Sequence, residues 1–185
     1  TNAGSYVAAH LYTDEAILRA IECGIRSLEH CNLITSETAR LAAQMGCIAC
    51  PTLITYDKLK SEGESMGLPP ASIAKVDDVR LRGLESLTIM QDAGLPMAYG
   101  SDLLGGMQPH QSGEFELRGQ VLSPLTVIRS TTVIAAELLR MEGLIGTLQP
   151  GAFADLILLE RNPLEDLSIF SGQGEGIKTI VKDAS

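Results

Sequence analysis

The sequence contains no tryptophan, and aromatic residues make up only 4% of its 185 positions, so any hydrophobic core must be mainly aliphatic. Basic residues are also few: 14 Lys and Arg stand against 23 Asp and Glu, which gives a net charge of −9. This balance argues against a nucleic-acid or membrane-surface partner, because both are bound through basic patches. No run of 18 apolar residues occurs, so no transmembrane helix is expected. The remaining composition, 45% hydrophobic and 20% charged, is that of a globular protein.

Cysteine is scarce as well, and only Cys47 and Cys50 are spaced as a CxxC pair. This pair lies inside the apolar run CIACPTLI, and no second CxxC accompanies it. Residues three apart on a strand point to opposite faces, which makes a shared ligand role difficult. We therefore expect small buried hydrophobic side chains in a reducing compartment rather than a redox or zinc site.

The first 100 residues alternate between short apolar runs and helical patterns. The expected strands are SYVAAH (5–10), IRSLEH (25–30), CIACPTLI (47–54) and PMAYGSD (96–102). The expected helices follow them at about 14–23, 36–45 and 72–93, the first of them capped by Thr13. Such β-α-β alternation predicts an α/β fold with a parallel sheet covered by helices.

The rest of the chain has a different pattern. A glycine-rich loop precedes a helix that begins at Ser123-Pro124, breaks near Thr131-Thr132 and continues to about Met141. The last 40 residues suggest strands at 144–149, 152–160 and 176–183 around turns, without crossover helices. We therefore expect two parts, residues 1–143 and 144–185, the second a small separate sheet.

Three of the expected strands end in residues that bind metals: His10, His30 and Asp102. In parallel α/β proteins, functional groups gather at the carboxyl ends of the strands. His10 and His30 are one βα unit apart, so they would lie at the same level on neighbouring strands. Imidazole and carboxylate suit Zn²⁺, Fe²⁺ or Mn²⁺. Each residue alone also has an ordinary explanation, as a hydrogen-bonded structural histidine or a turn aspartate.

Three further residues lie in positions that could serve such a site. His110 is in the loop after Asp102 and is a candidate for substrate contact, or an ordinary surface residue. Glu114 is expected to anchor that loop to the following helix. Tyr56, after the third strand, would line the functional face in a barrel, or pack as a loop residue.

The motif order H…EH…PT…GSD, followed by LIGTLQPGAFADLILLERNPLED, resembles the amidohydrolase superfamily of metal-dependent hydrolases. Within it, the prolidase-like and imidazolonepropionase-like branch is the most similar. The likeness extends from about Val7 to Asp183, and the motif GTLxPGxxADL together with GSD is quite specific. SLEHC resembles the family's SIEHG, with Cys31 in place of glycine.

The resemblance implies the second half of a (β/α)8 TIM barrel, strands 5–8, followed by returning strands of a small β-sandwich domain. His10 and His30 match the metal ligands of strands 5 and 6. Asp102 matches the strand-8 aspartate, a metal ligand that also shuttles a proton. The resemblance also implies one or two divalent ions, with Zn²⁺ as the expected metal, which would activate a hydroxide that hydrolyses amide or other C–N bonds. The substrates it implies are Xaa-Pro dipeptides or N-acyl amino acids.

The sequence departs from the family pattern in what it does not contain. A His-x-His on strand 1 and a lysine on strand 4 are absent, and TNAGSYVAAH reads as the middle of a protein. We expect the missing N-terminal half of the barrel as a partner, a homo-oligomer, and a cytoplasmic location by default. Because half a barrel leaves open edges, the alternative is a catalytically incomplete fragment or assembly subunit.

Overall fold

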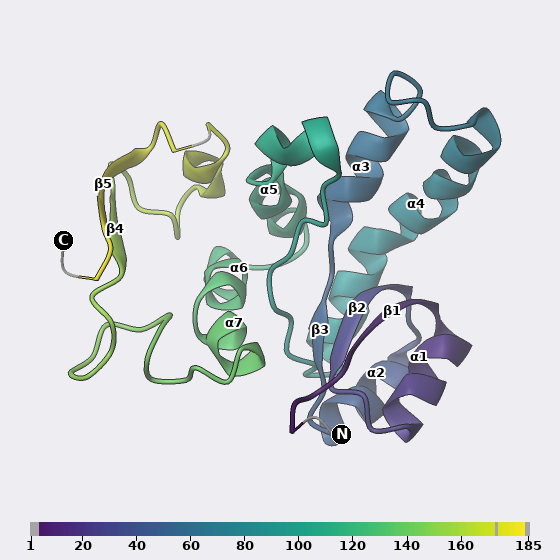
Figure 1. Cartoon of the computed structure of the whole chain (residues 1–185), viewed down its shortest axis with the longest axis horizontal. Coiled ribbons are helices and arrows are strands. Elements are labelled where there is room, and N and C mark those ends of the chain that lie inside the picture. The colour runs from purple at the N-terminus through teal and green to yellow at the C-terminus, as the bar shows by residue number, and fades with distance from the viewer. Residues whose placement is uncertain (1–3, 173, 184–185) are drawn as a thin grey trace.

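The computed structural model describes residues 4–172 and 174–183, and Figure 1 shows how they are arranged. A parallel sheet with covering helices forms one end of the molecule, three short helices follow it, and a two-stranded ribbon forms the other end. The elements are β1 (Ala8–Thr13), α1 (Asp14–Glu22), β2 (Ser27–Leu33), α2 (Ser36–Gln44), β3 (Ile48–Cys50), α3 (Leu53–Glu62), α4 (Pro70–Asp92), η1 (Gly105–His110), α5 (Gly113–Gly119), α6 (Pro124–Thr131), α7 (Val133–Leu138), β4 (Leu156–Leu159), η2 (Leu167–Phe170) and β5 (Ile177–Val181).

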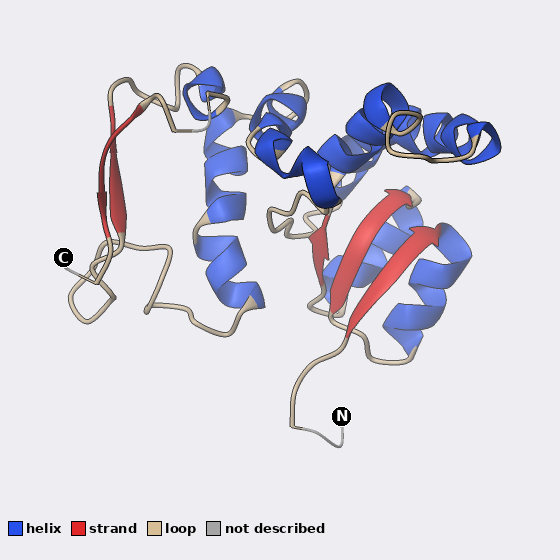
Figure 2. Ribbon diagram, turned by 45° about the horizontal axis from the view of Figure 1, so that its top comes forward, coloured by secondary structure: helices blue, strands red, loops and turns tan. Residues whose placement is uncertain are grey.

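The main sheet has the order β1-β2-β3, and both strand pairs are parallel, as the β-α-β pattern predicts. Figure 2 shows these strands side by side, well apart from the β4-β5 ribbon. Helices α1 and α2 begin where the patterns indicate, and Thr13 caps α1 by accepting a hydrogen bond from the Ala16 backbone. The α/β fold class is therefore confirmed over this region.

The expected fourth strand, PMAYGSD, is wrong in its extent. Met97 forms only an isolated parallel bridge with Ala49, supported by a hydrogen bond from Ala98 N to Ala49 O at 2.8 Å. Beyond this point the backbone turns away from the sheet, because the Tyr99 N–H donates to Ser130 O instead. The segment continues the sheet order after β3 without forming a regular strand.

Two other strand boundaries differ from the expectation. β1 and β2 do not end at their histidines but continue to Thr13 and Leu33. β3 ends at Cys50, and the expected strand residues Leu53 and Ile54 open helix α3 instead.

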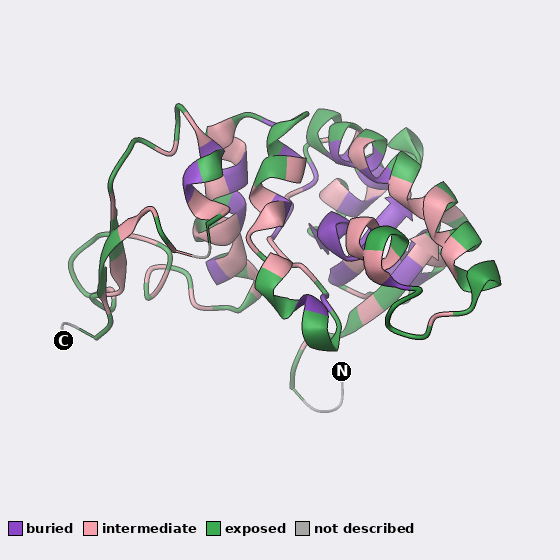
Figure 3. Cartoon of the chain, turned by 90° about the horizontal axis from the view of Figure 1, so that it is seen from above, coloured by how far each residue is buried: buried purple, intermediate pink, exposed green. Residues whose placement is uncertain are grey.

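The core lies between the sheet and helices α1, α2 and α4, and it is aliphatic as the composition predicts. Figure 3 shows the buried residues concentrated in this part of the chain. The central side chains are fully or almost fully buried: Ile17, Ile21, Leu28, Ala39, Ala42, Leu87 and Met90. Burial of one such aliphatic side chain contributes roughly 1.5–3 kcal/mol, so this layer holds β1–β3 in place.

The tail is much more open. β4 and β5 form an antiparallel pair whose Leu158 and Ile180 side chains remain exposed. β5 confirms the last expected strand, whereas the expected strand at 144–149 is wrong, because only Glu142 and Ile145 form an isolated bridge there. The helix break near Thr132 is confirmed, and α7 ends at Leu138 rather than near Met141. Among the described residues, no helix is long and apolar enough to cross a membrane.

Candidate metal and catalytic site

The two candidate metal-binding histidines meet on neighbouring strands of the sheet. His30 Nε2 lies 2.8 Å from His10 Nδ1, across the β1-β2 pair. The backbone of His30 and Cys31 is in the left-handed region, with φ of 71° and 57°. Non-glycine residues in sparsely populated backbone conformations cost on the order of 1–3 kcal/mol each. This local strain is therefore tolerated at the position that brings the two imidazoles together.

The second ring nitrogen of His30 is also occupied. Its Nδ1 shares a hydrogen bond with Thr52 Oγ1 at 2.8 Å, and both residues are buried. Burial lowers the pKa of His30, the neighbouring His10 lowers it further, and the Asp102 carboxylate opposes both effects. His30 is thus held as a neutral imidazole, the protonation state in which a ring nitrogen can bind a metal.

Two tyrosines form an aromatic wall beside the histidines. The Tyr12 ring stacks on His30 with 5.2 Å between centroids, and it lies edge-on to His10 at 4.7 Å. The Tyr56 hydroxyl donates to the Tyr12 hydroxyl at 3.2 Å, and Tyr56 is only 5% exposed. Burial raises the pKa of Tyr56, so its hydroxyl stays protonated. Tyr56 therefore lies beside the histidine pair, with its ring centroid 6.2 Å from that of His30, and its contact with substrate stays a prediction.

Sequence reasoning did not single out Tyr12 or Thr52 as site residues. Tyr12 is two residues after His10 on the same strand, and side chains at i and i+2 share a face. That spacing was the available signal. Thr52 had a weaker signal, since it directly follows Pro51 at the end of an apolar run.

Asp102 lies near the histidine pair but does not complete a metal cluster with it. It is exposed at the start of the 102–112 loop, with a left-handed φ of 49°, and its charge acts on His30. Among the described residues, no three His, Cys, Asp or Glu side chains are grouped so that they could hold a metal ion. The structure thus brings together His10 and His30, and the ligand role of Asp102 stays a prediction.

The donor set nevertheless fits a divalent ion in part. Two imidazole nitrogens face each other, and His30 is held neutral. An ion that took both nitrogens as ligands would replace their mutual hydrogen bond, and its remaining ligands would come from other groups, since sites of this kind use three or four donors.

His110 makes a different contact from the one expected. Its Nε2 lies 3.0 Å from Glu62 Oε1, which links η1 to the last turn of α3. It also lines a cavity of about 300 Å³ together with Asp57 and Lys58. The structure gives His110 a role in holding the loop, and its contact with substrate stays a prediction.

The cysteine pair has the properties of core residues. Cys47 and Cys50 are buried, and all four cysteines are free. Burial raises the pKa of both thiols, that of Cys50 to about 12. A thiol in this state is a poor nucleophile and metal ligand.

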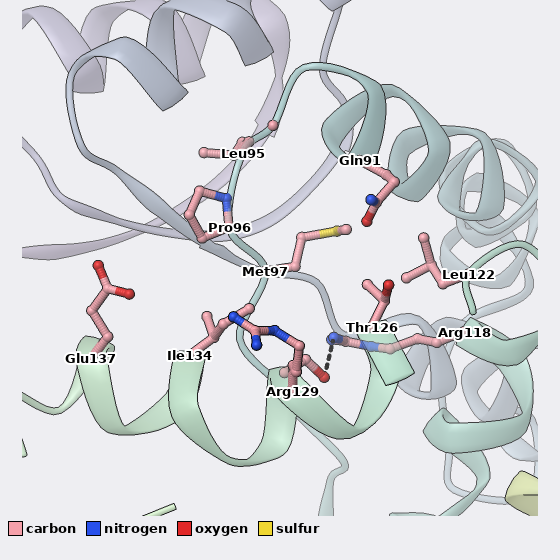
Figure 4. A pocket seen from close by; sticks show the side chains of 12 residues that line it. Gln91, Leu95, Pro96, Met97, Arg118, Leu122, Thr126, Arg129, Ile134 and Glu137 are labelled. Atoms are coloured by element: carbon pink, nitrogen blue, oxygen red, sulfur yellow. Dashed lines mark hydrogen bonds between the residues drawn. The ribbon is translucent and has the colours of Figure 1, made fainter. Parts of the chain in front are cut away.

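A cavity beside residues 95–97 is lined by neither His10 nor His30. Figure 4 shows it between that segment, the end of α4, and helices α5 to α7, with Arg118, Arg129 and Glu137 among its lining residues. Its volume is about 300 Å³. This space is separate from the histidine pair.

Comparisons with known proteins identify the family of this chain. The chain matches the Amidohydrolase family over residues 1–184. The ochratoxinase of Aspergillus niger is 31% identical over 166 residues, which cover 89% of this chain and 34% of that protein. A solved amidohydrolase is 50% identical with a TM-score of 0.96, and a solved prolidase complexed with N-methylphosphonate-L-proline is 44% identical with a TM-score of 0.96. Both structural matches cover 100% of this chain and 45% of the other, so the chain spans less than half the length of these relatives.

Proposed function

Because the chain belongs to the amidohydrolase family, we propose that it supplies part of the active site of a metal-dependent hydrolase of amide or related C–N bonds. In this proposal β1, β2, β3 and the Met97 segment are strands 5–8 of a TIM barrel. Residues 144–185 then belong to a small β-sandwich domain. The match of the whole chain to 45% of solved relatives supports both assignments.

The observation that carries the proposal is the meeting of His10 and His30 at 2.8 Å, with His30 held neutral by burial. These two residues would hold a divalent ion, for which we propose Zn²⁺. Such an ion, when bound, lowers the pKa of water and polarises a carbonyl group. The Tyr12 and Tyr56 rings shield His30 on its flanks and so limit the access of bulk water to the imidazole.

Asp102 would move the proton in this reaction. Its carboxylate is exposed next to the histidine pair, so it can accept a proton from an attacking water and deliver it to the leaving amine. The left-handed backbone at Asp102 turns the chain into the following loop, which carries His110. Tyr56 and His110 are our candidates for contacts with substrate.

The proposed substrates are Xaa-Pro dipeptides or N-acyl amino acids. The support is the 44% identity to a solved prolidase that binds a proline phosphonate, and the 31% identity to ochratoxinase. Loops at the ends of barrel strands set the choice of substrate, so the panel of test substrates must vary the acyl group.

The test is hydrolysis of a panel of Xaa-Pro dipeptides and N-acyl amino acids, with metal content measured on the same samples. Asp102→Asn should lower kcat by about 10²–10⁴-fold, the usual contribution of a general acid–base, while the protein remains folded. His30→Ala should abolish metal retention. Normal turnover in Asp102→Asn would remove Asp102 from the mechanism, and metal-independent turnover would overturn the proposal as a whole.

A second candidate is that this chain alone is a catalytically incomplete subunit. The observation that favours it is that its described residues form no three-ligand metal group. Turnover of the same panel by the 185-residue chain with Zn²⁺ or Co²⁺ would rule this candidate out.

A further inference from the structure

We propose that Glu114 and Arg118 are positioning residues for His30: they take over the capping of helix α3, which leaves the Thr52 hydroxyl free to hold the imidazole. The inference rests on the proposed function in so far as His30 is taken as a metal ligand. The capping exchange itself is a matter of this chain's own contacts.

Thr52 is bonded to His30 and not to the helix that it precedes. It occupies the N-cap of α3, yet its side chain makes no capping hydrogen bond. Thr13, Thr35 and Ser123, which are extended, all accept from a backbone N–H of their own helix. Thr52 has φ −137° and ψ 66°, and like Ser112 and Thr132, which also lie outside the extended geometry, it makes no such bond. Thr52 instead shares its hydroxyl with His30 Nδ1 at 2.8 Å. A residue that usually stabilises its own helix is here used by a neighbouring strand.

Glu114 does the capping from another helix. The Ile54 N–H donates to Glu114 Oε2 at 2.7 Å, and the Leu53 N–H also bonds to this carboxylate. Glu114 lies on α5 and is 0% exposed. Because the first N–H groups of a helix have no partner within it, a buried carboxylate at this point satisfies donors that Thr52 has left open.

Arg118 neutralises the buried Glu114 carboxylate and connects it to the backbone beside β3. Its Nε donates to Glu114 Oε1 at 2.7 Å, and the side chain is 0% exposed. One terminal nitrogen donates to the Pro51 carbonyl, and the other donates to the Ala98 carbonyl at 3.0 Å. Figure 4 shows the Arg118 guanidinium reaching from its helix toward the segment that carries Met97. The pair thus joins the end of β3 to the segment that leads to Asp102.

The backbone around Thr52 is closely packed and anchored. A Cβ added at Gly100 would lie 2.6 Å from Cys50 Sγ and 3.3 Å from Thr52 Cγ2. The backbone on either side of Thr52 is held by Arg118 at Pro51 and by Glu114 at Leu53 and Ile54. With Glu114 and Arg118 in place, the backbone that carries Thr52 is therefore anchored on both sides, and its hydroxyl stays bonded to the His30 ring.

In the absence of Glu114, the first N–H groups of α3 and His30 Nδ1 would compete for the Thr52 hydroxyl. Without the Glu114 carboxylate, the N–H groups that open α3 would lack a buried acceptor, and the nearest standard acceptor is the N-cap hydroxyl of Thr52. If Thr52 turns to cap α3, His30 Nδ1 loses its partner. Loss of the group that orients a metal-binding histidine typically weakens metal affinity by about 10–100-fold.

The experiment compares Glu114→Ala, Thr52→Val and their double variant in the purified protein. Two quantities are measured: the ¹⁵N chemical shifts of the His30 ring in the metal-free protein, and Zn²⁺ affinity by competition with a chelator. We expect both single variants to change the His30 Nδ1 shift and to weaken Zn²⁺ binding by about 10–100-fold. We expect the double variant to bind no more weakly than Thr52→Val, because both changes act through one hydroxyl. Thr52→Ser, which keeps the hydroxyl, should behave like wild type.

Asp14→Ala is the matched control. Asp14 also bonds to the start of a neighbouring helix from outside, since it accepts from the Thr35 N–H at 2.7 Å and from the Thr38 hydroxyl at 2.9 Å, but it is not among the hydrogen-bond partners of His30. Its loss should reduce stability and leave the His30 signals unchanged. The proposal is overturned if Glu114→Ala reduces stability without moving the His30 nitrogen shifts, or if the losses of Zn²⁺ affinity multiply in the double variant.

Two provisions keep the result interpretable. If Glu114→Ala does not fold, Glu114→Gln retains one oxygen acceptor and should move the His30 signals in the same direction by less, so unchanged signals would again overturn the proposal. If the wild-type protein binds no Zn²⁺, the proposed function fails, while the nitrogen shifts of metal-free His30 still decide whether Glu114 acts through Thr52.

Discussion

Helices α2 and α3 begin in similar ways, and the contrast between their first residues is informative. Each follows a parallel strand, each has a threonine at the N-cap, and each is met by a carboxylate from another helix. At α2, Thr35 accepts from the Thr38 N–H at 3.3 Å, and Asp14 adds a bond to the Thr35 N–H. At α3, Thr52 makes no such bond, and the capping depends on the carboxylate alone.

The difference shows how a functional side chain changes the requirements of the helix beside it. The start of α2 lies at the surface and is bonded by two groups, Thr35 within the first turn and Asp14 from α1. The start of α3 is buried and is capped by Glu114, which lies 60 positions away in the sequence. That arrangement requires a buried guanidinium to balance the carboxylate. Helix α5 therefore carries two buried charged side chains, Glu114 and Arg118, and the Thr52 hydroxyl stays bonded to His30.

Replacement of Arg118 should cause the largest loss of stability, and the loss should be specific to the start of α3. Arg118→Met would leave Glu114 buried without its counter-ion, which costs about 3–5 kcal/mol when one partner of a buried pair is removed. Urea denaturation monitored by circular dichroism measures the loss. No comparable loss is expected from Asp14→Ala at the start of α2, because that carboxylate is near the surface and can be replaced by water.

The same variant should also change the pH dependence of stability. Burial raises the pKa of Glu114, and Arg118 is the main opposing influence, so its removal raises that pKa further. Between the unfolded pKa of about 4.3 and the raised folded pKa, the native state binds more protons than the unfolded state. Stability must therefore fall as pH rises through this interval. Arg118→Met should be less impaired at pH 5 than at pH 8, and a pH-independent deficit would contradict an unpaired Glu114.

Paired replacement provides the control. Glu114→Leu with Arg118→Met removes both charges, and such swaps are often neutral or stabilising. The double variant should recover much of the stability that Arg118→Met alone loses. A double variant as unstable as the single one would show that the loss comes from packing rather than from the unpaired charge.

A methyl group at Gly100 should have the next largest effect, and it acts on the end of β3 and the N-cap of α3 rather than on α2. Gly100→Ala places a Cβ against Cys50 Sγ and Thr52 Cγ2, and overpacking of this kind costs typically about 1–3 kcal/mol. Thermal unfolding measures the cost. Cys50→Ala should relieve it in the double variant, because 2.6 Å to Cys50 is the closest approach. If Cys50→Ala brings no relief, the strain lies elsewhere.

The sequence predicted best those features whose causes are local. The Thr13 cap and the starts of α1 and α2 depend on residues within one turn of each other. The pairing of His10 with His30 followed from one βα unit of spacing in a parallel sheet. The family assignment, which the Amidohydrolase match confirms, followed from the motifs at His30, Asp102 and Pro150.

The features that were missed depend on distant partners. The first residues of α3, Leu53 and Ile54, were expected as the end of a strand, and no helix was predicted after them; Thr52 offers no side-chain cap, and the capping carboxylate is that of the distant Glu114. The fourth strand was overextended because the Tyr99 N–H bonds to Ser130 O, a contact that no local pattern encodes. Glu114 was expected to anchor a loop, and its burial against the start of α3 depends on tertiary packing.

Removal of the Thr35 hydroxyl should have the smallest effect, and it tests the contrast from the side of α2. Thr35→Ala deletes an N-cap acceptor, which costs about 0.5–2 kcal/mol, and the low end is expected because Asp14 still binds the Thr35 N–H. The free energy of unfolding from urea titration gives the value, with Thr35→Ser as the control that keeps the oxygen. Zn²⁺ affinity should stay at the wild-type level, because Thr35 bonds to Thr38 and Asp14 and not to either histidine. If Thr35→Ala weakened Zn²⁺ binding as much as Thr52→Val does, the special status of Thr52 would be lost, and both threonines would have to be regarded as general supports of the sheet edge.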